Sequence, residues 1–192
     1  MNTKIELRFK LQGDWIPSDH GFSLYSAICG ALPWIHDTQG CLIAPIRGKW
    51  NGKSGLAITE QSLLRVRCVP DLVKEWQRLQ GKTLEIGGCP LKVKSFTAYN
   101  LTPGLNLYSH YTTTKNGQIE AVFDAYLESR LSEIGVQGTA TRIARRVILI
   151  HGKQVVGYGV RFTAASPADS LTLQAIGLGG RAKMGGGFFE PA

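Results

Sequence analysis

Glycines and cations gather in one short stretch near the end of the 192-residue chain. Six glycines and two cations, Arg181 and Lys183, lie between Gly177 and Phe189. Because glycine tolerates positive φ and lets a ligand approach the backbone, such a stretch suits contact with a phosphate chain. A P-loop needs Ser or Thr after its lysine, where this chain has Met184, and a dinucleotide loop needs a helix after it. The sequence therefore predicts a basic, glycine-rich loop that contacts phosphates through its backbone.

The elements predicted over residues 5–98 follow the order of a known structural unit. Apolar and charged side chains alternate over residues 5–11, which indicates a half-buried strand. Apolar residues then recur at helical spacing over residues 20–35, with Ser18 or Asp19 as the expected N-cap. Further elements are predicted at 41–47 (strand), 63–69 (strand), 70–79 (helix), and 83–87 with 91–98 (hairpin). This β-α-β-β-α-β order is typical of a ferredoxin-like unit, whose two helices cover one sheet face and leave the other free.

The second half of the chain repeats that order. We predict a strand at 105–113, an acidic helix at 118–134, a hairpin of strands 142–150 and 154–164, a helix beginning near Ser166, and a last strand at 188–189. Turn-forming residues around Pro103 predict the boundary. The expected fold class is α+β, with two tandem ferredoxin-like (RRM-like) units over residues 1–99 and 100–192.

Positive charge is in excess and unevenly placed. The formal net charge is +8 and the pI about 9.5, which favours a polyanionic partner over a neutral one. From residue 142 to residue 183, Asp169 is the one acid among seven cations: Arg142, Arg145, Arg146, Lys153, Arg161, Arg181 and Lys183. This segregation predicts a nucleic-acid surface around the second hairpin and the glycine-rich loop. A merely solvated cationic face is the alternative.

Other sequence features speak against zinc sites, secretion signals and membrane spans. The four cysteines (Cys29, Cys41, Cys68 and Cys89) form no Cys-x-x-Cys pair and have no histidine at zinc-finger spacing. We therefore expect buried, reduced thiols and no metal or cofactor. No signal-type leader and no apolar run of membrane-spanning length is present, so a cytoplasmic location is expected.

Two segments at opposite ends of the chain resemble one family. The first reads Ile16-Pro17-x-Asp19-His20-Gly21-x-x-Leu24-Tyr25-Ser26-Ala27, and the second runs from Asp169 through Gly187 with the pattern Gly-x-Gly-Gly-Arg-x-x-Met-Gly-x-Gly. With two ferredoxin-like units, they resemble the CRISPR-associated endoribonucleases of the RAMP superfamily, in the family usually numbered six, and within it the small MYXAN subgroup. The resemblance covers essentially the whole chain.

The resemblance implies a reaction and a set of catalytic residues. The implied reaction is a metal-independent cut within the CRISPR repeat, in which a 2′-hydroxyl attacks the neighbouring phosphate. Because the catalytic histidine of many members lies in or near the first helix, His20 is the expected catalytic residue, with Tyr25 as its assistant. A capping role for His20 and a core or stacking role for Tyr25 are the alternatives. His36 is less favoured, because a continuous helix would place it roughly 24 Å from His20.

RNA binding is expected elsewhere in the chain. His110 and His151 are interpreted as a strand and a turn residue, although His151 lies on the basic hairpin. The expected RNA-binding residues are Arg142, Arg145, Arg146, Lys153, Gly179, Gly180, Arg181, Lys183 and Gly185. Side chains of neighbouring strand residues point to opposite faces, so at most one of Arg145 and Arg146 is expected to face a bound stem.

The resemblance also implies partners. These are the CRISPR repeat RNA and mature guide RNA, the backbone and cap subunits of an effector complex, and transposition proteins if the system is linked to a transposon. A non-catalytic RNA-binding subunit of the same superfamily is the alternative function. A generic RRM module is disfavoured, because neither unit has the aromatic strand motif on which such modules stack bases.

Overall fold

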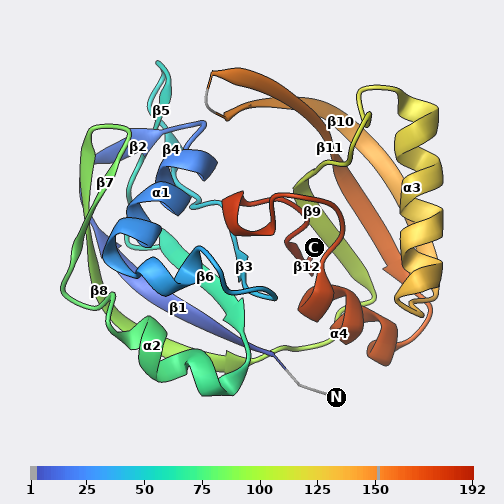
Figure 1. Cartoon of the computed structure of the whole chain (residues 1–192), viewed down its shortest axis with the longest axis horizontal. Coiled ribbons are helices and arrows are strands. Elements are labelled where there is room, and N and C mark those ends of the chain that lie inside the picture. The colour runs from blue at the N-terminus through green and yellow to red at the C-terminus, as the bar shows by residue number, and fades with distance from the viewer. Residues whose placement is uncertain (1–3, 151) are drawn as a thin grey trace. The chain divides into compact units, whose positions relative to one another are not determined.

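The computed structural model describes residues 4–150 and 152–192 (Figure 1). The chain divides into two compact units, residues 1–100 and 101–192. Among the described helices, none is both long and apolar enough to cross a bilayer.

The first unit is a sheet with helices on one face. Its strand order is β3-β6-β1-β8-β7, with β1 Ile5–Gln12, β3 Leu42–Ile43, β6 Leu63–Cys68, β7 Thr83–Ile86 and β8 Cys89–Asn100. Without β7, this is the 2-3-1-4 order of a ferredoxin-like unit. The predicted alternation of β1 is confirmed, since Leu7 and Phe9 are fully buried in the core with Leu24 and Ile28 of α1 (Gly21–Ala31). The second helix is short, with η2 at Pro70–Leu72 and α2 at Val73–Gln77.

The other face of this sheet is charged but not uniformly exposed. Glu6 is buried and accepts hydrogen bonds from Arg8 (2.7 Å), Arg65 (3.1 Å) and Arg67 (2.9 Å). Burial alone would raise the pKa of Glu6, but the arginines outweigh it and lower that pKa to about 2. One carboxylate therefore holds three guanidinium groups together, and the expectation of a wholly free face is wrong at Glu6 and Arg67.

The first helix ends earlier than its periodicity predicts. Helix α1 stops at Ala31, Leu32 leaves helical geometry (φ −137°, ψ 81°), and a separate 3-10 turn, η1, covers Pro33–Ile35. A proline disfavours helical φ and ψ in the residue before it and cannot donate a backbone hydrogen bond. The chain therefore changes direction at Leu32, and His36 does not continue the axis of α1.

A small second sheet was missed by the sequence analysis. Its order is β2-β5-β4, with β2 Trp15–Pro17, β5 Gly55–Ala57 and β4 Lys49–Trp50. The segment between residues 48 and 55 was expected to be a loop. Strands of two or three residues are too short for alternation to reveal them.

The second unit repeats the ferredoxin-like topology. Its sheet order is β10-β11-β9-β12, with β9 Asn106–Thr112, β10 Gly138–Ile150, β11 Lys153–Ala164 and β12 Phe189–Pro191. The helices are α3 Glu120–Glu133 and α4 Pro167–Ile176, followed by the 3-10 turn η3 Ala182–Met184. Ser166 caps α4 as predicted, since its side chain accepts a hydrogen bond from the Asp169 backbone N–H. Strand β10 begins four residues before its predicted start.

Candidate active site

His20 lies in the interior of the first unit. It is almost fully buried and precedes α1 as its N-cap residue, without a side-chain cap bond. Its Nε2 accepts the backbone N–H of Ile46 at 2.9 Å, and its Nδ1 lies 2.9 Å from the carbonyl oxygen of Pro17. Because Nε2 is an acceptor, the ring proton lies on Nδ1 and is donated to Pro17. Both ring nitrogens are therefore engaged by backbone groups.

The environment of His20 also disfavours its charged form. Burial lowers the pKa of His20 against the opposing influence of the hydrogen bonds with the Pro17 and Ser18 backbone. A neutral imidazole that joins two backbone segments is a structural residue. The catalytic role expected for His20 stays a prediction, and this geometry speaks against it. Its expected alternative is a capping residue at the helix N-terminus without catalytic chemistry; His20 is indeed the N-cap residue of α1, although its side chain makes no cap hydrogen bond.

Tyr25 and His36 meet at the surface of the same unit. The hydroxyl oxygen of Tyr25 lies 3.3 Å from Nδ1 of His36, and His36 is exposed. Burial, a hydrogen bond with Cys29 and the negative charge of Asp37 raise the pKa of Tyr25, so its hydroxyl keeps its proton. The pair combines a proton donor with an imidazole, the side chain best suited to proton transfer near neutral pH.

Local sequence explains how these two residues meet. The turn η1 is anchored by Ile35, which is fully buried, and by Trp34, whose ring packs edge-on against Trp76 at 5.6 Å between centroids. The backbone N–H of His36 donates to the carbonyl of Pro33 at 3.1 Å. His36 is thereby held beside α1. The dipeptide Leu32-Pro33 was the available sequence signal for this arrangement, since a residue before proline disfavours helix.

The glycine-rich loop uses its backbone mainly for its own folding. The N–H groups of Gly180 and Gly187 donate to the carbonyls of Thr113 (2.8 Å) and Tyr111 (2.7 Å), and that of Gly179 donates to the Tyr126 hydroxyl (2.9 Å). At Gly187, where φ is 64°, an added Cβ would overlap the carbonyl oxygen of Leu178. These glycines are thus required for close backbone packing, and phosphate contact through them stays a prediction.

The cations of this loop remain at its surface. Arg181 is exposed and adopts a left-handed conformation (φ 65°), and Lys183 lies half-buried in η3. Gly185 also has positive φ (90°) and is buried. A left-handed non-glycine residue costs backbone free energy. Side chains, rather than backbone N–H groups, are therefore the better candidates for contact with phosphate here.

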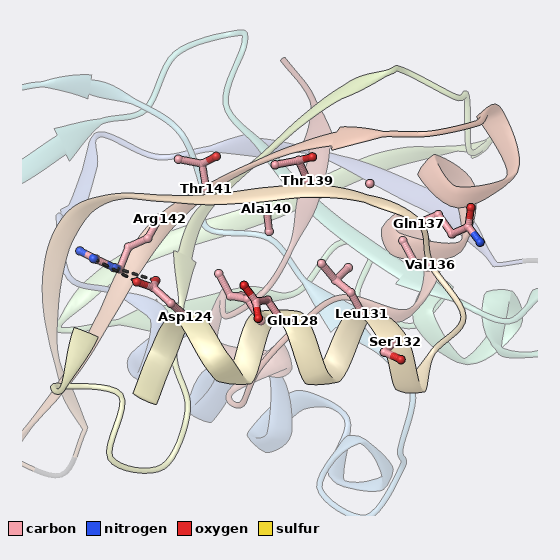
Figure 2. Close-up of a pocket in the computed structure, with 12 residues that line it drawn as sticks. Asp124, Glu128, Leu131, Ser132, Val136, Gln137, Thr139, Ala140, Thr141 and Arg142 are labelled. Atoms are coloured by element: carbon pink, nitrogen blue, oxygen red, sulfur yellow. Dashed lines mark hydrogen bonds and ion pairs between the residues drawn. The ribbon is translucent and has the colours of Figure 1, made fainter. Parts of the chain in front are cut away.

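Arg142 is engaged by the acidic helix α3. Its Nε donates to Asp124 at 2.9 Å, its Nη2 lies 3.0 Å from Glu120, and its guanidinium lies 5.2 Å from the ring centroid of Tyr158. A groove of about 770 Å³ lies between α3 and β10, and Asp124, Glu128 and Arg142 are among the residues that line it. Figure 2 shows Arg142 and Asp124 at one end of this groove. Carboxylates along one wall repel phosphate. Arg142 therefore fastens α3 to β10, and a role in RNA binding is not favoured for it.

Arg145 and Arg146 lie on opposite faces of the second hairpin, as expected of neighbouring strand residues. A bulge between Arg142 and Arg145 shifts the register, so that Arg145 is opposite Tyr158 and Arg146 opposite Gly157. Arg145 is exposed, whereas half-buried Arg146 donates to the Tyr108 hydroxyl at 3.5 Å.

Three further residues singled out in the sequence are Lys153, His110 and His151. Lys153 is exposed at the start of β11, and His110 lies on β9 as predicted. His151 lies outside the described residues. Across residues 4–150 and 152–192, no group of three or more His, Cys, Asp or Glu side chains could hold a metal ion.

Sequence comparison identifies relatives of the chain. Residues 5–192 match the family described as Cas6 Crispr. A protein of Myxococcus xanthus (strain DK1622), named CRISPR-associated endonuclease Cas6, is 33% identical over 187 residues, which cover 97% of this chain and 81% of that protein.

Solved structures share the fold. One, described as an RAMP protein binding different RNA substrates, has a TM-score of 0.68 at 14% identity, with 98% of each chain covered. Another, described as CRISPR associated protein Cas6, has a TM-score of 0.66 at 13% identity, with 99% of each chain covered. The expected pair of tandem ferredoxin-like units is confirmed. The resemblance seen in the two terminal segments is confirmed as well, and the chain belongs to the Cas6 family.

Proposed function

We propose that this protein is an endoribonuclease that cuts precursor CRISPR RNA within the repeat. The observation that carries the proposal is the surface contact between Tyr25 and His36. The support from relatives is the 33% identity to a protein named a CRISPR-associated endonuclease. The net charge of +8 fits a polyanionic substrate.

The proposed reaction is an internal transfer at one phosphate. The 2′-oxygen attacks the adjacent phosphorus and gives up its proton, and the bond from phosphorus to the 5′-oxygen breaks. The departing 5′-oxygen takes a proton, so the products are a 2′,3′-cyclic phosphate and a 5′-hydroxyl. The atoms balance without water or a metal ion. The reaction therefore needs groups that accept and donate protons at these two oxygens.

His36 is the proposed proton-transfer residue. The imidazolium form of His36 carries a proton on each nitrogen, so Nδ1–H donates to the Tyr25 oxygen while the Nε2 proton can pass to the departing 5′-oxygen and leave a neutral ring. Tyr25 is then a positioning residue that sets the tautomer and orientation of the ring. His20 is not assigned this step, because both its nitrogens are engaged by backbone groups.

RNA binding is proposed to fall mainly to exposed cations. Arg145, Lys153 and Arg181 are exposed and can approach phosphates without breaking an ion pair recorded in the structure. A-form RNA presents phosphates and shape rather than base edges, so cations suffice to hold a stem. After cleavage, we propose that the protein stays on the repeat stem beside the other subunits of an effector complex.

The decisive experiment compares His36→Ala, His20→Asn and the wild type on a synthetic repeat RNA in EDTA. We expect His36→Ala to slow cleavage by roughly 10²- to 10⁴-fold while RNA affinity changes little. His20→Asn, checked for folding by circular dichroism, should still cut. A 2′-deoxy substitution at the cleaved nucleotide should block the reaction, and mass spectrometry should find the cyclic phosphate.

Other outcomes separate the alternatives. Inactivity of folded His20→Asn with an active His36→Ala would restore His20 as the catalytic histidine. Tight binding without cleavage by the wild type would identify a non-catalytic RNA-binding subunit, which is the alternative function of this superfamily.

A further inference from the structure

We propose that the β2-β5-β4 sheet binds an unpaired stretch of RNA, with a base stacked on Trp15. The cations of the segment that contains β4, Arg47, Lys49 and Lys53, would contact the phosphates of that stretch. The inference rests on the proposed function only in taking RNA as the ligand. None of its residues belongs to the Tyr25–His36 pair or to the basic hairpin.

Two tryptophans are exposed on this small sheet. Trp50 is 55% exposed and Trp15 is 43% exposed. The other two tryptophans of the chain, Trp34 and Trp76, pack against each other, and Trp76 is fully buried. Large exposed rings cost free energy in water unless a partner covers them. Each base that stacks on an aromatic ring contributes substantially to the affinity for single strands.

The charge around the tryptophans points to a polyanion. From Thr38 to Thr59 the chain contains Arg47, Lys49 and Lys53 and no acidic residue. All three cations lie within three residues of Trp50 along the chain. Aromatic rings interleaved with cations in this way are typical of grooves that bind single-stranded nucleic acid.

The strand register arranges one face of the sheet for such a ligand. Trp15 and Lys49 both pair with Ala57 of the central strand, so all three side chains project from the same face. Trp50 pairs with Leu56, as Ile16 does, and therefore projects from the opposite face. The small Ala57 leaves room between the indole and the ammonium group. A base can stack on the ring while its phosphate reaches the lysine.

Hydrogen bonds and packing within the first unit order this surface. The Asn51 side chain accepts the backbone N–H groups of Lys53 (3.0 Å) and Gly55 (3.1 Å), which closes the turn between β4 and β5. At Gly55 an added Cβ would lie 2.5 Å from a ring carbon of Trp15, so the indole lies against the backbone at this glycine. Ordered binding groups lose little entropy when a ligand arrives.

His20 connects the two chain segments that form this surface. Its Nε2 accepts a hydrogen bond from the backbone N–H of Ile46, the residue before Arg47, and its Nδ1 donates to the carbonyl oxygen of Pro17 at the end of β2. The two chain segments that supply the tryptophans are thus joined through one buried imidazole. His20 is a positioning residue for this surface.

The test uses the full-length protein and a twelve-nucleotide oligouridylate, which is unstructured. Binding should quench tryptophan emission, and Trp15→Phe should reduce the amplitude of quenching. Trp15→Ala should weaken affinity roughly tenfold. Leu105→Ala removes a side chain that is 56% exposed in the second unit and is the matched control, for which affinity should be unchanged.

A charge variant tests the phosphate contacts. Lys49→Gln with Lys53→Gln should reduce the slope of log K against log salt by about 1.4 for a single strand. Lys74→Gln with Lys115→Gln, which removes two exposed lysines elsewhere, should leave the slope unchanged. An equal reduction of this salt slope in both double variants would mean that RNA binding depends only on the net charge of the protein, which contradicts the proposal.

Two further outcomes would overturn the inference. One is wild-type affinity for oligouridylate in Trp15→Ala, which would mean that the ring contacts something else, such as a protein subunit. The other is quenching by phosphatidylserine vesicles and not by oligouridylate, which would assign the surface to a membrane. Because this probe is not cleaved as a repeat, failure here leaves the result for His36→Ala standing, and the reverse also holds.

Discussion

The hydroxyl of Tyr25 lies 3.3 Å from Nδ1 of His36, although the two residues are eleven positions apart. In a continuous helix they would be about three turns apart and out of contact. The break at Leu32 and Pro33 brings them together. The separation is long for an O–H···N hydrogen bond, and catalytic hydrogen bonds often shorten when substrate binds.

Replacing Tyr25 by Phe should slow cleavage without weakening binding. The change removes one hydrogen bond that orients the His36 ring, so we expect roughly a tenfold loss in the single-turnover rate. The measurement is the cleavage rate of saturated enzyme across pH, together with the Kd for uncleavable 2′-deoxy repeat RNA. Tyr99→Phe alters an exposed tyrosine of the same unit and should cut at the wild-type rate. An unchanged rate in Tyr25→Phe would remove Tyr25 from the site.

Stability should depend on pH through His20. Burial lowers the pKa of His20 in the folded state below its value of about 6.5 in the unfolded chain. The unfolded state then binds more protons than the folded state. The stability that neutral His20 contributes is therefore fully present above pH 6.5 and is lost as the pH falls toward the folded pKa. Urea unfolding of the wild type at pH 7.5, 6.5 and 5.5 should give a free energy of unfolding that decreases as the pH falls.

A variant isolates the His20 contribution. His20→Asn should be less stable at pH 7.5 by roughly 2 kcal/mol, because a buried backbone group loses its partner. It should also lose the pH dependence between 7.5 and 5.5. Glu6 does not contribute to this pH dependence, since its folded pKa of about 2 confines its effect on stability to lower pH. Equal slopes for variant and wild type would show that His20 is not the titrating group.

The two arginines of β10 should have separable effects. Arg145→Gln should reduce the salt slope of repeat-RNA binding by about 1 with unchanged thermal stability, because Arg145 is exposed. Arg142→Gln should lower Tm and leave the salt slope unchanged, since Arg142 holds Asp124 and Glu120 of α3. The reverse pattern would place Arg142 on the RNA.

The glycine-rich loop should tolerate substitution at one glycine and not at another. Gly187→Ala should destabilise the protein by at least about 2 kcal/mol, because positive φ and the Leu178 carbonyl both exclude a Cβ. Gly180→Ala, whose Cβ would lie 3.9 Å from the nearest atom, is the matched control and should be neutral within about 0.5 kcal/mol. Denaturant unfolding measures both. Similar stability of the two variants would contradict the packing role of Gly187.

Part of this protein can be predicted from residue order alone. Alternation along β1, the Ser166 cap of α4 and the β7–β8 hairpin depend on neighbours within a few positions, so local periodicity suffices to find them. The family follows in the same way, because its two motifs are continuous in the sequence.

Function at single residues depends on contacts between distant positions, and the tertiary structure decided it. His20 and His36 are both polar residues near one helix. His20 lies in the core because Pro17 and Ile46, 26 positions beyond it, both bond its ring. His36 lies at the surface beside Tyr25 because Pro33 ends the helix and Trp34 anchors the turn on Trp76. Periodicity describes which face of an element is apolar, whereas the hydrogen-bond partners of a buried imidazole come from elsewhere in the chain and emerge only on folding.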